Sequence, residues 1–176
     1  MRRTLMIHPD SRCAAVTGIE ADVVCARPGA VALTYRVTGL MSGVWLPAAV
    51  RPERTDGLWR RTCFEAFVGD GRGYLEFNFA PSTQWAAYRF AGYRDGMTSA
   101  SEIAPPLIDV TADEQSFELR VSLDLPSDAA GRLGLSAVIE ETSGKLSYWA
   151  LAHPPGKPDF HHSTAFAVDL PPTDAS

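Results

Sequence analysis

The feature that most constrains this chain is a strict alternation of apolar and polar residues over positions 117–125. Its apolar members recur at every second position: Phe117, Leu119, Val121, Leu123 and Leu125. Because successive side chains of a β-strand point to opposite faces, a spacing of two places all five on one face. The pattern therefore predicts a half-buried strand over 115–124.

The same period recurs along the chain, and segments rich in Gly, Pro, Ser or Asp separate the alternating runs. Strands are predicted near residues 4–8, 20–26, 30–38, 62–69, 73–80, 85–92, 107–111, 115–124, 133–141, 145–151 and 165–170. Many short strands without a long helical period indicate an all-β protein, an antiparallel two-sheet β-sandwich. We expect one domain over residues 1–170 and a frayed tail over residues 171–176.

Composition excludes several classes of protein. The 176 residues are 45% hydrophobic and 21% charged, which is the balance of a globular domain rather than a disordered chain. The net charge of −5 argues against nucleic acid as a partner, and no apolar run is long enough for a transmembrane helix. With no signal peptide and no Cys-x-x-Cys spacing, Cys13, Cys25 and Cys63 are expected to be reduced, mostly buried thiols in the cytoplasm.

Three neighbouring predicted strands carry polar residues in the same alternation phase. If they pair in sequence order, one surface collects Glu65, Glu76, Asn78, Trp85 and Arg89. Carboxylates, an amide, a guanidinium and an indole together suit a sugar, whose hydroxyls bond polar groups and whose ring stacks on tryptophan. The alternative interpretation is a satisfied ion-pair network between the glutamates and nearby arginines, because such networks resemble binding sites.

A second candidate region is the proline-rich segment over residues 152–164. Its prolines prevent a regular central strand, so a stiff loop is expected there. Trp149 precedes the loop and could stack on a ligand, while His153, Asp159 and His161 could supply polar contacts. We expect the loop to close one end of the groove next to Arg60 or Arg94. The alternative is that it merely covers the end of a sheet, in which case the site would lie on the 39–61 loop around Trp45 and Trp59.

The sequence also resembles a known family. The run over residues 56–67, the pattern Tyr-x-Glu-Phe-Asn-x-x-Pro-Ser at positions 74–82 and the segment 84–94 are similar to those of uncharacterised bacterial DOMON-like domain proteins. Residues 148–162 resemble the last strand and loop of the same group, which in turn resembles the family-nine carbohydrate-binding modules. The resemblance implies a two-sheet β-sandwich. It does not name a ligand, because likeness of fold alone does not assign function.

These observations predict a non-catalytic module that binds a carbohydrate or similar small polar ligand, with an unknown oligomeric state. One alternative is a b-type haem domain with Met41 or Met97 paired with His153, His161 or His162, as DOMON relatives include such carriers. Another is an enzyme that uses the Glu65 and Glu76 carboxylates. The histidines match no standard zinc spacing, and calcium at Asp56 and Asp70 would lack a recognisable ligand loop.

Overall fold

The computed structural model describes residues 1–27, 29–69, 72–126, 129 and 131–170. The twelve strands in this part of the chain are β1 (Arg2–Ile7), β2 (Val16–Arg27), β3 (Ala30–Gly39), β4 (Cys63–Gly69), β5 (Tyr74–Phe79), β6 (Trp85–Phe90), β7 (Thr98–Ser99), β8 (Leu107–Ala112), β9 (Ser116–Asp124), β10 (Arg132–Glu140), β11 (Leu146–Ala150) and β12 (Val168–Asp169). Short 3-10 helices lie at Met41–Gly43 (η1), Leu58–Arg60 (η2) and Ser163–Ala165 (η3).

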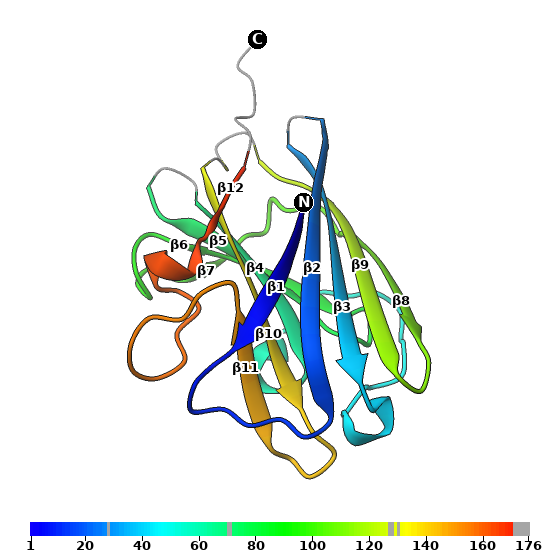
Figure 1. Ribbon diagram of the computed structural model, residues 1–176. Coiled ribbons are helices and arrows are strands. Elements are labelled where there is room, and N and C mark those ends of the chain that lie inside the picture. The colour runs from blue at the N-terminus through cyan, green and yellow to red at the C-terminus, as the bar shows by residue number, and fades with distance from the viewer. Residues whose placement is uncertain (28, 70–71, 127–128, 130, 171–176) are drawn as a thin grey trace.

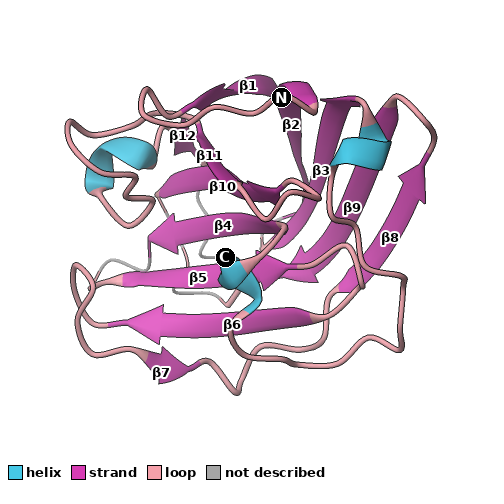
Figure 2. Ribbon diagram, turned by 90° about the horizontal axis from the view of Figure 1, so that it is seen from below, coloured by secondary structure: helices cyan, strands magenta, loops and turns pink. Residues whose placement is uncertain are grey.

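All the strand pairs are antiparallel and form one continuous sheet, in the order β7-β6-β5-β4-β10-β11-β1-β2-β3-β9-β8, with β12 beside β10. The all-β antiparallel expectation is thus confirmed, whereas the two expected sheets are joined into one. Strand β1 makes the join, because Arg2–Leu5 pair with β2 and Met6–Ile7 pair with β11. The sheet curls strongly at this strand, so that its two halves face each other (Figures 1 and 2).

The main core fills the space between the two halves. Tyr35 of β3 donates a 2.7 Å hydrogen bond to the backbone oxygen of Glu65 on β4, and Phe64 of β4 stacks on Phe117 of β9 with ring centroids 5.6 Å apart. The prediction that the apolar residues of β9 share a buried face is confirmed for Phe117, Leu119, Val121 and Leu123. Leu125 follows the strand and is half-buried.

Each segment predicted as a strand contains one, with boundaries that differ by a few residues, and of the strands in the described residues only the two-residue β7 was not predicted. The tail at 171–176 lies outside the described residues. The cysteines are free, but only Cys63 is buried; Cys13 is half-buried and Cys25 is exposed, so the expectation of mostly buried thiols was wrong. Within the described residues no helix has the length and apolar character needed to cross a membrane.

Strands β4, β5 and β6 are buried on both faces, which positions the site. Their inner face packs into the main core. Their outer face carries a second apolar cluster that includes Phe67, Tyr74, Tyr88 and Phe90, and the loops at 58–60 and 158–166 cover it. A polar residue that points outward from these strands is therefore enclosed.

Candidate functional site

The floor of the candidate site is the outer face of β4, β5 and β10. Glu65 of β4 lies opposite Asn78 of β5 and Ser136 of β10, while Glu76 lies opposite Phe67. Glu65 and Glu76 are therefore diagonal neighbours on one face, where side chains of adjacent strands come within reach of each other. This part of the predicted polar face is confirmed.

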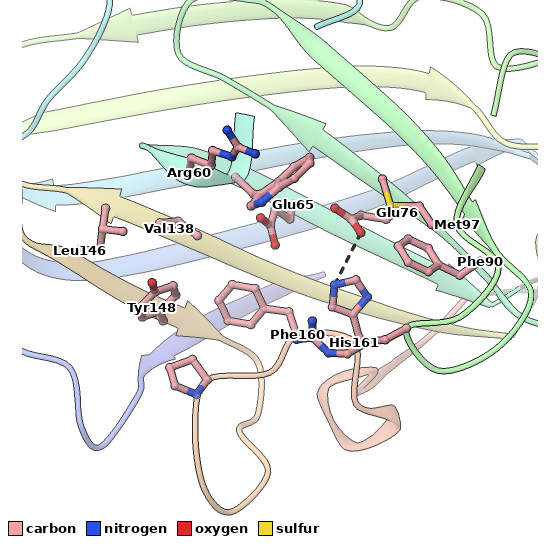
Figure 3. Close-up of a pocket in the computed structure, with 13 residues that line it drawn as sticks. Arg60, Glu65, Glu76, Phe90, Met97, Val138, Leu146, Tyr148, Phe160 and His161 are labelled. Carbon is pink, nitrogen blue, oxygen red and sulfur yellow. Dashed lines mark ion pairs between the residues drawn. The ribbon is translucent and has the colours of Figure 1, made fainter. Parts of the chain in front are cut away.

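A cavity of about 630 Å³ lies over this floor. Its walls come from η2, the loop after β6, the strands β10 and β11, and the loop after β11. The lining residues are Trp59, Arg60, Glu65, Glu76, Phe90, Arg94, Met97, Val138, Leu146, Tyr148, Pro158, Phe160 and His161. Figure 3 shows the carboxylates of Glu65 and Glu76 directed into the same space, with Arg60 on one side and Phe160 on the other.

The two carboxyl groups on the floor are almost completely shielded from water. Glu65 Oε2 accepts a 3.1 Å hydrogen bond from the Ser136 hydroxyl, and Glu76 Oε1 accepts one of 2.7 Å from the Asn78 amide. Burial raises the pKa of Glu65 well above its usual value, and the nearby charge of Glu76 raises it further. Burial also raises the pKa of Glu76, although the hydrogen bond from Asn78 opposes that shift.

His161 reaches over the floor from the loop that follows β11. Its Nδ1 lies 2.8 Å from the Tyr74 hydroxyl and its Nε2 lies 3.7 Å from Glu76 Oε2. The ring also packs edge-on against Phe67, Tyr74 and Phe90. Burial, helped by the charge of Arg94, lowers the pKa of His161 to about 4, so the imidazole is neutral at pH 7.

Two loops meet at one end of the cavity. Arg94 donates to Asp159 Oδ1 from Nη2 at 2.8 Å and from Nε at 3.2 Å, and the hydroxyl of Tyr93 donates to Asp159 Oδ2. The Arg94 and Tyr93 hydrogen bonds lower the pKa of Asp159, overcoming the opposing effect of burial. The expectation that the C-terminal loop closes one end of the groove next to Arg60 or Arg94 is therefore confirmed.

Two of the predicted site residues, Trp85 and Arg89, lie on the other face of the sheet. Trp85 pairs with Phe79 and packs into the main core under the guanidinium of Arg54, while Arg89 pairs with Leu75 and bonds Glu102. The sequence analysis assigned the residues of β6 to the wrong faces, because both faces of this strand carry apolar residues. The residues that do face the site side are Ala86, Tyr88 and Phe90.

The predicted positions were also wrong for Trp149 on β11 and for His153 in the loop that follows it. Trp149 points into the main core, where its Nε1 donates to Ser147, and its neighbour Tyr148 lines the cavity instead. His153 does not line the cavity: its Nε2 bonds the backbone oxygen of Met6, and its ring lies 4.9 Å from that of His8. Of the residues predicted from this region, only His161 lines the cavity.

Sequence reasoning missed most of the aromatic walls of the cavity. Trp59 had been named only for an alternative location of the site, and Tyr148 and Phe160 had not been proposed as site residues. The only available signal was position, since each stands next to a residue that had been considered: Arg60, Trp149 and His161.

The arrangement does not fit the haem alternative. Met41 is buried in the main core, on the opposite side of the sheet from His161. Met97 lines the cavity, but of the three histidines only His161 lines it too, with its Nδ1 2.8 Å from the Tyr74 hydroxyl and its Nε2 directed to Glu76 at 3.7 Å. Among the described residues, no group of three or more His, Cys, Asp and Glu side chains could hold a metal ion.

Asp56 and Asp70 were considered as calcium ligands and set aside for want of a ligand loop. Asp56 accepts a 2.7 Å hydrogen bond from the Tyr88 hydroxyl, and Asp70 lies outside the described residues.

Comparison with solved structures places the fold. A family 9 carbohydrate-binding module from Caldicellulosiruptor kristjanssonii in complex with glucose superposes with a TM-score of 0.50 and 8% identity, covering 84% of this chain and 72% of that one. A family 9 module from the same organism in complex with cellotriose gives a TM-score of 0.49, 12% identity and coverages of 89% and 74%. No family model and no curated protein matches the sequence. The expected likeness to family-nine modules is thus confirmed for the fold.

Proposed function

We propose that this protein binds a small carbohydrate in the cavity lined by Glu65, Glu76 and Tyr148. The observation that carries the proposal is the combination of aromatic walls and buried polar groups around one open cavity. Trp59, Tyr148 and Phe160 offer apolar ring surfaces, while two carboxyl groups and two guanidinium groups offer hydrogen bonds. A sugar needs both, because its ring faces are apolar and its edge is a row of hydroxyls.

The dimensions and burial of the site also support the proposal. A volume of about 630 Å³ falls within the ~300–1,000 Å³ range of small-molecule sites. The carboxyl groups of Glu65 and Glu76 are already desolvated in the folded protein, so a hydroxyl that bonds them replaces little water. The CBM9-like fold is consistent with this function but does not by itself supply it.

The experiment is a binding titration with glucose and cellotriose, followed by ligand-observed and protein-observed NMR. Binding should perturb amides of β4, β5 and β11 and of the loop at 158–161. Trp59→Ala should weaken binding about tenfold or more, because a stacked ring contributes on the order of 1–3 kcal/mol. Trp45→Ala is the matched control, since Trp45 is another half-buried tryptophan beside an arginine but does not line the cavity.

The proposal would be overturned if neither these sugars nor xylose and galactose at high millimolar concentration perturbed the NMR signals of the protein. An equal loss of affinity in both tryptophan variants would also count against it, because the effect would then not belong to the cavity.

A further inference from the structure

The two carboxyl groups on the cavity floor are neighbours, yet they have different surroundings. Glu65 is the more buried of the pair and receives one hydrogen bond, from Ser136. Glu76 receives a hydrogen bond from Asn78 and faces a second polar hydrogen from His161. Two close carboxyl groups cannot both ionise readily, so the one with more donors holds the negative charge.

The hydrogen bonds around Tyr74 indicate which nitrogen of His161 carries its proton. The backbone N–H of Arg94 donates to the Tyr74 hydroxyl oxygen at 3.1 Å. Because that oxygen already accepts one hydrogen, we assign the Tyr74 hydroxyl as donor to His161 Nδ1, 2.8 Å away. The neutral imidazole therefore carries its hydrogen on Nε2, toward Glu76 Oε2. This arrangement favours Glu76 as the carboxylate of the pair and Glu65 as the carboxylic acid, whose pKa burial and the charge of Glu76 raise well above its usual value.

We propose that the cavity interconverts the α and β anomers of a reducing sugar, with Glu76 as the general base and Glu65 as the general acid. This inference rests on the proposed function and goes beyond the non-catalytic module that the sequence led us to expect. A base and an acid whose environments separate their roles, and which line the same cavity, are the requirements for proton-transfer catalysis.

The reaction balances without any co-reactant. Glu76 removes the proton from the hydroxyl at C1 as the bond between C1 and the ring oxygen breaks, and Glu65 gives its proton to that ring oxygen. The open-chain aldehyde rotates about the C1–C2 bond. The ring oxygen then attacks the other face of the carbonyl, returning its proton to Glu65, while Glu76 returns the first proton to the oxygen on C1.

The placement of the two carboxyl groups favours this reaction over glycoside hydrolysis. Glycosidases set their two carboxyl groups on either side of the scissile bond. Here both side chains rise from adjacent strands on the same face of one sheet. The two oxygens that exchange protons during ring opening are bonded to the same carbon, so they can be served from one side.

The test follows freshly dissolved α-D-glucose by polarimetry at pH 7, and exchange NMR on the equilibrium mixture confirms the rate. The wild-type protein should accelerate the approach to equilibrium in proportion to its concentration. Glu65→Gln and Glu76→Gln should each lower the protein-dependent rate by about 100-fold or more, the usual contribution of a general acid or base. Glu20→Gln, which removes an exposed carboxylate from β2, is the matched control and should keep the wild-type rate.

Methyl β-D-glucoside tests whether the catalysed rate arises in the cavity. It has no free hydroxyl at C1, so it cannot react, but it should occupy the same site and inhibit the reaction of glucose. Binding of glucose to the wild-type protein without any protein-dependent rate would overturn the catalytic inference and leave the proposed function intact. Failure of glucose to bind would remove the catalytic inference as tested here, and failure of glucose, cellotriose, xylose and galactose together would remove the proposed function as well. The wild-type measurement decides the matter even if a glutamine variant does not fold, and full activity in either folded variant would also overturn the assignment.

Discussion

Arg94 and Asp159 lie 65 positions apart in the chain, yet their side chains form a two-pronged hydrogen bond at the mouth of the cavity. Arg94 belongs to the loop after β6 and Asp159 to the loop after β11, so this contact ties together two walls of the site. Arg94 also adopts a positive φ of 53°, which only a few per cent of non-glycine residues do.

Asp159→Asn should loosen both loops with little change in global stability. The contact is partly exposed, so its loss should cost about 0.2–1 kcal/mol of unfolding free energy. Amide hydrogen exchange of residues 91–97 and 152–162 should nevertheless rise. Asp124→Asn, which breaks the exposed Arg27–Asp124 pair, should leave exchange in these loops unchanged.

His161 should make the stability of the protein depend on pH in the mildly acidic range. Its pKa is about 4 in the folded state and about 6.5 when unfolded, so between these values the unfolded state binds more protons. Stability is therefore intact above pH 6.5 and falls as the pH drops toward 4, by up to about 3 kcal/mol. The loss should be smaller in His161→Gln, as measured by urea unfolding at pH 7.0 and 4.5. Equal losses in the two proteins would show that His161 is not the group responsible.

Tyr148 and Trp149 are adjacent in sequence, but substitution of Trp149 should mainly lower stability, whereas substitution of Tyr148 should mainly lower sugar affinity. Trp149→Ala should cost about 3–5 kcal/mol of unfolding free energy, because it empties a position in the main core. Tyr148→Ala should cost less and should weaken sugar binding, because that side chain lines the cavity. Chemical denaturation and sugar titration of both variants check the pair, and a binding defect confined to Trp149→Ala would contradict the assignment of faces.

Leu119→Ala tests the main core. This leucine is fully buried on β9, so its truncation should cost about 2–5 kcal/mol in chemical denaturation. Leu107→Ala on the neighbouring β8 is the control. Its side chain is 77% exposed, and its loss should change stability by less than about 0.5 kcal/mol.

The strands could be predicted from the sequence, but the faces of the most important ones could not. In β9 one face meets the core and the other meets water, so apolar and polar residues alternate and the assignment is unambiguous. In β4, β5 and β6 both faces are covered, and almost every side chain is buried. The alternation of apolar and polar residues, from which the faces of a strand are assigned, is therefore missing in the strands that carry the site.

Glu65 and Glu76 were still placed correctly, since a charged residue within a run of phenylalanines marks its face. Trp85 and Arg89 were not, because a tryptophan and an arginine stem can pack into a core as readily as onto a polar surface. The aromatic walls depend on how loops far apart in sequence fold over the sheet. Trp59 and Phe160 share a cavity only because η2 and the loop after β11 cover the same strands, which no local pattern encodes.

The position of β1 also has a consequence for the order in which the protein can assemble during synthesis. Strand β1, which joins the two halves of the sheet, is synthesised well before one of its partners, β11, which ends at Ala150. Until β11 has been translated, Met6 and Ile7 of β1 lack their hydrogen-bonding partner, and this edge is an open template for other strands. Closure must therefore wait for the C-terminal segment, which makes this a late, long-range step of the kind that slows the folding of β proteins.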